Sequence, residues 1–265
     1  MRMTLALARA GFRRYSTYRQ ATAASILTNS MFGFLRVYVL FAAVAAAGGV
    51  AGGYTREQLS TYTWVTQGMI GVVALWGWNE LADKVRTGEV VGDLLRPVNP
   101  IWTYFATDLG RAGFASCTRL LAPIVVGALV FPFYWPRHPA SYPLFLVSVL
   151  LAVSVCFALR YLVNLSAFWL LDSRGITAVW TLVSGLGAGL YFPMSFLPGW
   201  LAFVMQYLTP FPSIMQFPAD VLVERDGFGG QFTRLAVQAL WALICLAIVF
   251  AVQRRAVRKL VVQGG

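Results

Sequence analysis

Seven charged side chains lie close together in residues 80–100, which read ELADKVRTGEVVGDLLRPVNP. Side chains of opposite charge at such close spacing can form ion pairs, within the chain or with a partner. Charges of both signs beside apolar side chains suit a docking surface for a partner protein. The residues expected to contact that partner are Asp83, Lys84, Arg86, Glu89, Asp93 and Arg96. An ordinary solvated loop is the alternative interpretation.

The spacing within this charged loop predicts two short helices. Glu80 and Lys84 are four residues apart and can pair on one face of a helix over 80–86. Gly88 interrupts that helix, and a second turn over 90–95 carries apolar residues on one side. Two prolines then end the regular structure. The loop is thus predicted to have an apolar face of its own.

Other chemistry has no support in the sequence. The one histidine, His138, lies between prolines, and the three cysteines fall separately in apolar runs, so no metal site is predicted. The chain lacks a GxSxG elbow and a GxxxxGK[ST] phosphate loop. We therefore expect no catalytic residue and no cofactor in this chain, and an intramembrane enzyme is disfavoured.

Composition places the chain among integral membrane proteins. Hydrophobic residues make up 58% of it, charged residues 12%, and the mean hydropathy is +0.67, whereas soluble domains carry about 25% charged residues. We expect one transmembrane domain over residues 1–265. The net charge of +11 is explained by basic residues flanking spans, so nucleic acid is not an expected partner whereas membrane lipid is.

Six apolar runs predict an all-α membrane protein with six transmembrane helices. They cover residues 21–47, 59–79, 114–135, 142–163, 178–196 and 232–252. Residues 1–20 are rich in arginine with apolar residues on one helical face, which is typical of a helix at the membrane surface. A solvated basic leader is the alternative, and no cleavable signal peptide is expected.

Basic residues favour both termini and the charged loop on the cytoplasmic side. An even number of crossings follows. Residues 193–218, apolar but broken by Pro198, Pro210 and Pro212, are then expected to form a re-entrant or interfacial element on the outer side.

Charges within the apolar runs need partners. Arg36 lies near the middle of the first run, where it either lines a translocation pathway or subunit seam or meets a buried partner in the bundle. Arg119 is expected to be structural. Gly185 and Gly189, four residues apart in an apolar run, indicate close helix packing or a hinge at such a seam.

Other charged residues are expected at the ends of spans. Asp108 and Arg111 can pair as a brace. Asp172 and Arg174 form either a second partner contact or a plain turn. The acids near residue 220 are expected in a solvated outer loop, and they are Asp220, Glu224 and Asp226.

Several stretches resemble a known family. GEVVGDLLRPVNPIWTYFATDLGR, at 88–111, is similar to the signature of ABC type-2 exporter permeases, and in particular to a six-span bacterial subgroup with an LLRPVNP inner loop. Thr87 departs from that subgroup, which has serine there. Four further stretches share the resemblance, at residues 164–176, 192–201, 209–222 and 254–265.

The resemblance implies a permease subunit in a bacterial cell membrane that exports an amphipathic or hydrophobic substrate. Its implied partners are a second permease, identical or different, and two copies of a cytosolic ATPase that bind ATP and Mg. Residues 1–20 would be an interfacial elbow helix, 80–100 the coupling loop, and 193–218 an outer re-entrant hairpin. A stand-alone secondary transporter or channel is the alternative, but it predicts internal repeats and paired ionisable groups at mid-membrane, which the sequence does not show.

Overall fold

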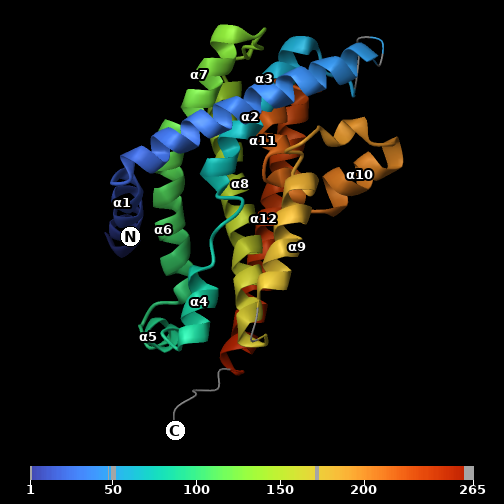
Figure 1. Ribbon diagram of the computed structural model, residues 1–265. Helices are drawn as coiled ribbons and strands as arrows, with labels where there is room; N and C mark the ends of the chain where they lie inside the picture. The colour runs from blue at the N-terminus through green and yellow to red at the C-terminus, as the bar shows by residue number, and fades with distance from the viewer. Residues whose placement is uncertain (1, 47, 49–51, 171–172, 260–265) are drawn as a thin grey trace.

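The computed structural model describes residues 2–46, 48, 52–170 and 173–259, which form helices and turns with no strand among them (Figure 1). The all-α prediction is confirmed. The α-helices are α1 (Arg2–Ser16), α2 (Arg19–Ala46), α3 (Arg56–Val73), α4 (Glu80–Thr87), α5 (Val90–Leu94), α6 (Pro100–Ala115), α7 (Leu121–Val130), α8 (Ser141–Leu165), α9 (Arg174–Gly187), α10 (Gly199–Leu208), α11 (Gln216–Leu222) and α12 (Gly227–Val257).

Four helical stretches of the described residues are long and apolar enough to cross a membrane. They are Gln20–Ala46, Pro100–Val130, Ser141–Phe168 and Gly227–Val257. The other two expected spans, the second and the fifth, correspond to α3, which is less apolar, and to α9, which has only 14 residues. The expected six-span count is therefore not reached by length and composition alone.

The polar character of α3 follows from its position in the protein interior. Nearly all of its side chains are buried, including a row of polar ones, Ser60, Thr61, Thr63, Thr66 and Gln67. Thr63 and Thr66 donate their hydroxyl hydrogens to the carbonyls of Leu59 and Tyr62 on their own helix. A Cβ added at Gly68 would lie 2.9 Å from the Cα of Leu120. A central helix packed this closely does not need a lipid-facing apolar surface.

Two spans end earlier than predicted. The second span was expected to reach residue 79, but α3 ends at Val73 because Ala74 takes a left-handed conformation with φ 47°. The chain then runs beside α8 to α4 (Figure 1). The Trp180 indole N–H donates a hydrogen bond of 2.8 Å to the Leu75 carbonyl, and this bond holds the unwound link in place. Likewise α9 ends at Gly187, not at residue 196.

The third span begins at Pro100, fourteen residues before the expected start at residue 114. Charged residues lower the mean hydropathy of this stretch, so the apolar pattern did not predict a span there. In the structure these charges are buried and paired. Between α6 and α7 the chain makes a π-helical turn, Ser116–Leu120. Pro123 lacks an N–H for the carbonyl four residues earlier, so a local widening of the helix relieves the mismatch.

The N-terminal residues form α1, which packs along α6 (Figure 1). Gly11 and Gly110 allow the two backbones to touch: an added Cβ on either would collide with the carbonyl of Thr107 or Ala8. The rings of Phe12 and Phe114 meet edge to face, with centroids 5.5 Å apart. This contact positions the arginine-rich helix against the bundle.

The two ends of the bundle carry different features. Figure 1 shows α4, α5, the carboxyl end of α8, the amino end of α9 and the carboxyl end of α12 together at one end, here called the α4 end. The amino end of α3 and the far end of α7 lie at the opposite end.

The proline-broken residues 193–218 do not form one uniform element. The helix α10 projects from the side of the bundle (Figure 1) and exposes Trp200, Phe203 and Leu208. By contrast α11 is wholly buried. Prolines 198, 210 and 212 mark the breaks between these pieces and the short turns Met194–Phe196 and Phe211–Ser213.

Candidate functional site

The charged loop folds as the two short helices that its pattern predicted. Gly88, with φ 80°, ends α4, and α5 follows within two residues. The Glu80–Lys84 pair closes with 3.5 Å between carboxylate oxygen and Nζ. The loop therefore has defined structure at the α4 end of the bundle.

One face of the loop is fixed to the bundle. Leu81 and Val90 are buried in a cluster with residues of α6 and α8. The Asn164 side chain of α8 accepts from the backbone N–H of Ala82, at 3.0 Å, and donates to the carbonyl of Trp78, at 2.9 Å. A movement of α4 would therefore act directly on α8.

Asp93 organises the charges on the bundle side of the loop. Its carboxylate lies 2.9 Å from Lys84 Nζ and 3.7 Å from an Arg96 nitrogen, and it accepts a hydrogen bond of 2.7 Å from the Tyr104 hydroxyl. Partial burial opposes ionisation, but the hydrogen bonds from Lys84 and Tyr104 outweigh it and lower the pKa of Asp93.

The opposite face of the loop is open to solvent. Asp83, Arg86 and Glu89 are exposed, as is Arg96, and the apolar Leu95 is 81% exposed. Of the six residues expected to contact a partner, Lys84 and Asp93 are thus partly buried. The other four are exposed and carry charges of both signs, although Asp83 pairs with Arg86 at 3.6 Å and Arg96 with Asp93.

A buried ionic cluster lies above this loop and joins three helices. Asp108 of α6 accepts from Arg111, at 2.7 Å, and from Arg160 of α8, also at 2.7 Å. Arg111 also donates to the carbonyls of Gly71 and Val72 at the end of α3, both at 2.8 Å. The expected Asp108–Arg111 pair is present, but sequence analysis did not assign Arg160 to it.

Arg36 is bound to neutral groups of its own chain. Its guanidinium donates to the Gln67 side chain at 2.7 Å, to the Thr66 hydroxyl at 3.1 Å and to the carbonyl of Leu190. These bonds tie α2 to α3 and to the chain after α9. The geometry matches the interpretation of a buried partner inside the bundle.

Gly185 and Gly189 have distinct local roles. Gly189 has φ 78° and ends α9: its N–H donates to Leu186, and the next N–H donates to Gly185. The carbonyl of Gly189 accepts from the Tyr62 hydroxyl at 2.6 Å. An added Cβ at Gly185 would lie 3.1 Å from the Tyr191 ring. Both glycines therefore have contacts within this chain.

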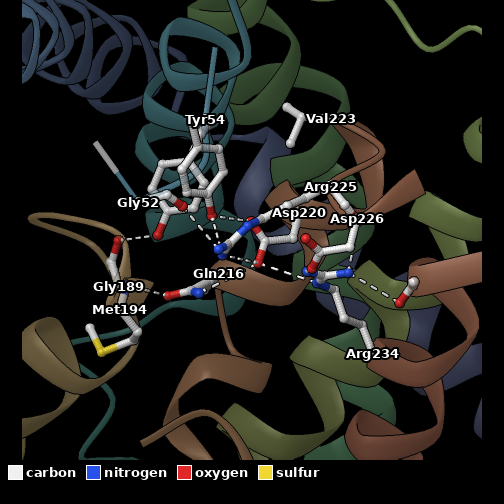
Figure 2. Close-up of polar contacts among 12 residues, drawn as sticks. Gly52, Tyr54, Gly189, Met194, Gln216, Asp220, Val223, Arg225, Asp226 and Arg234 are labelled. Carbon is white, nitrogen blue, oxygen red and sulfur yellow. Dashed lines mark hydrogen bonds and ion pairs between the residues drawn. The ribbon is translucent and has the colours of Figure 1, made fainter. Parts of the chain in front are cut away.

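A second buried ionic cluster lies at the opposite end of the bundle. Figure 2 shows Asp220 between Tyr54, Arg225 and Arg234. Asp220 is fully buried, accepts from the Tyr54 hydroxyl, and lies 3.3 Å from Arg234 and 3.8 Å from Arg225. Arg234 also pairs with Asp226 at 2.6 Å. The cluster joins α11, α12 and the start of α3.

The expectation of a solvated acidic loop at this end is wrong for two of its three acids. Asp220 is 0% and Glu224 6% exposed; only Asp226 reaches solvent. The Glu224 carboxylate accepts from Ser141, Tyr134 and two backbone N–H groups, at 2.7–3.1 Å. Burial raises the pKa of Glu224, but these hydrogen bonds outweigh it and lower the value to about 2.

No metal site accompanies these clusters. Within the described ranges, no group of three His, Cys, Asp or Glu side chains could hold a metal ion. Asp172, considered as part of a second partner contact, lies outside the described residues.

Comparison with known families decides the identity. Residues 27–264 match the model of a family described as ABC-2 family transporter protein. The chain belongs to this family. No curated protein and no solved structure matched the chain.

As an ABC-2 permease, the chain is a multi-pass membrane component of an ABC transporter and is not itself the catalytic subunit; permeases of this family typically work with an ATPase subunit. Two partners of the buried acids in this permease were not assigned from the sequence: Arg160, which pairs with Asp108, and Arg234, which pairs with Asp220. An arginine inside an apolar run signals that a partner is needed but does not name it.

Proposed function

We propose that this permease exports an amphipathic or hydrophobic substrate, driven by a separate cytosolic ATPase that docks on α4 and α5. The observation that carries the proposal is the two-sided construction of the charged loop. One side is fixed to α6 and α8, while Asp83, Arg86, Glu89 and the apolar Leu95 are exposed. Such a surface fits an apolar groove flanked by complementary charges.

The contacts of the charged loop with α3 and α8 explain how a movement of the ATPase would be transmitted to the helix bundle. The unwound link 74–79 joins α4 to α3, and Asn164 joins α4 to α8. The Asp108 cluster then connects the end of α3 with α6 and α8. ATP binding would favour one of two arrangements of these helices by binding it more tightly.

The assembly follows from the same proposal. Two ATPase subunits, which bind ATP and Mg, would act on two permeases, identical or different. Six crossings would be made by α2, α3, α6 with α7, α8, α9 and α12, with both termini in the cytoplasm of a bacterial cell. In this arrangement α1 is an interfacial elbow and residues 193–218 an outer re-entrant element. The location of α4, α5 and the basic end of α12 at one end supports it.

Co-purification with the partner ATPase tests the proposal. The double variant Asp83→Arg and Glu89→Arg changes two exposed acids without touching the Asp93 network. We expect the amount of ATPase bound to the tagged permease to fall about tenfold, because like charges would face each other at the contact. The matched control is Glu57→Arg, an exposed acid on α3 at the other end.

Retention of a fully bound, active ATPase by the double variant would contradict the docking assignment. Equal loss in the control would point to general damage instead. Detergent-solubilised yield and thermal stability of both variants distinguish a lost contact from a lost fold.

A further inference from the structure

A cavity of about 260 Å³ lies where α3 ends and the chain turns toward α4. It differs from the rest of the charged interior because none of the described residues lining it is acidic. The lining residues that matter here are two arginines, three aromatic residues and an amide: Arg111, Arg119, Tyr15, Trp76, Trp78 and Asn29.

Arg119 is the unusual group in this wall. It forms no hydrogen bond or ion pair with the described residues, and its Nε is buried without a partner. It lies on the π-helical turn between α6 and α7, a feature that often marks functional sites in helices. Gly71 leaves room for its side chain, since a Cβ there would lie 2.7 Å from Arg119 Cδ.

Arg111 is the second arginine in this wall, and its positive charge is not fully neutralised by a carboxylate. Arg111 is held by Asp108 and by two α3 carbonyls, so its position is fixed. Asp108, however, is shared with Arg160. One carboxylate therefore serves two guanidiniums, and Arg119 adds a third positive charge beside the cavity.

An adjoining cavity of about 210 Å³ shows the contrast. It shares Tyr15, Trp78 and Arg111 with the first, but its wall includes the acids Glu80 and Asp93. The same wall also carries Asp108, Arg14, Lys84 and Arg96, so acids and bases there are nearly balanced, whereas the first cavity has two arginines and no acid among its described lining residues. At about 260 Å³, the acid-free cavity lies just below the range of about 300–1,000 Å³ typical of pockets for drug-sized ligands.

We infer that the acid-free cavity binds an anionic amphipath. Its carboxylate, sulfonate or phosphate group would pair with Arg119, and its apolar body would lie against Trp76 and Trp78. A guanidinium without a partner carboxylate favours such a group through charge-assisted hydrogen bonds. That this ligand is the transported substrate rests on the proposed function; an anionic membrane lipid shares the same chemistry.

The backbone beside this site supports a ligand-binding role. Non-helical backbone within a membrane bundle is tolerated where it lines a cavity or is buried in protein, and interrupted helices mark binding sites in transporters. Here Trp76 and Trp78 lie on the unwound link that continues directly into α4. A change at the ligand site and a change at the charged loop would therefore be connected by a few residues of chain.

Binding of a dansyl-undecanoate probe to the purified permease in phosphatidylcholine nanodiscs tests the inference. Energy transfer from tryptophan to dansyl reports probe bound to protein, and empty discs give the background. The uncharged methyl ester of the probe is the matched ligand control. We expect Arg119→Gln to weaken binding of the acid about tenfold without affecting the ester.

Two further variants separate loss of charge from loss of fold. Arg119→Lys should retain most of the affinity, and Asn29→Asp, nearly the same shape, should weaken it by placing an acid in the wall. Arg137→Gln, an exposed arginine outside the cavity, should behave as wild type. Equal binding of acid and ester, or no effect of Arg119→Gln, would overturn the inference.

Phosphatidylglycerol in the discs identifies the source of the anion. If phosphatidylglycerol displaces the probe from the wild type but not from Arg119→Gln, the result supports the site and assigns it to a lipid headgroup. If phosphatidylglycerol does not displace the probe, the result supports a free amphipath as the ligand. Because the assay contains no ATP and no ATPase, its result is independent of the docking test. Either proposal can fail alone.

Discussion

At the scale of single residues, a buried acid at each end of this permease connects the helices that meet there. Asp108 and Asp220 are almost completely buried, and each contacts two guanidiniums. Removing one partner of a buried pair costs about 3–5 kcal/mol, because it leaves an uncompensated charge. Each of these carboxylates therefore keeps two arginines, and the helices that carry them, in place.

Glu224 gives a pH-dependent prediction at this scale. Its carboxylate accepts four hydrogen bonds, and its pKa is lowered from 4.5 to about 2. A lowered pKa in the folded state stabilises the fold fully above the unfolded value. We expect this contribution to be lost as the pH falls from 4.5 toward 2.

Thermal unfolding in detergent measures this contribution. Glu224→Gln should lower the melting temperature at pH 7, by about 2–4 °C per kcal/mol lost, and the difference from wild type should shrink at pH 3. Asp83→Asn, at an exposed acid, is the control and should change little. A difference that stays constant between pH 7 and pH 3 would show that ionised Glu224 is not the stabilising form.

At the scale of helices, close backbone contacts decide the arrangement. The contact between α1 and α6 depends on glycines, because an added Cβ at Gly110 would collide with the Ala8 carbonyl. Gly113, one turn further along α6, is a natural control: its added Cβ would make an ordinary contact of 3.8 Å with Phe12.

Gly110→Ala should therefore separate α1 from α6, whereas Gly113→Ala should be neutral or slightly stabilising, since alanine favours helix by about 1 kcal/mol over glycine. Trypsin cleavage after Arg13 and Arg14 measures the release of α1. We expect faster cleavage and a lower melting temperature only in Gly110→Ala. Equal behaviour of the two variants would mean that the packing of α1 does not depend on this approach.

At the scale of the whole molecule, the proposed topology predicts which residues share one side of the membrane. In a background with alanine at the three native cysteines, Asp83→Cys and Arg258→Cys should react with an impermeant maleimide from the same side. Arg137→Cys should react from the other side, because the 131–140 connection follows α7 at the opposite end of the bundle.

Labelling of Asp83→Cys and Arg137→Cys from the same side of the membrane would exclude the proposed orientation. Intact cells and inverted vesicles, compared with permeabilised samples, give the assignment for each site. Residue 258 lies just beyond α12, so its label also reports the side of the carboxyl end.

The amino-acid sequence by itself determined features that depend on neighbouring residues: the membrane class, the all-α architecture, the two helices around Gly88, and the Glu80–Lys84 and Asp108–Arg111 pairs. These follow from hydropathy, glycine and proline conformation, and helical spacing. Only the tertiary structure decided where α3 and α9 end, why a polar helix lies at the centre, and which arginines meet Asp108 and Asp220. Arg160 is 52 residues from Asp108, and a contact at that separation exists only after the helices have packed.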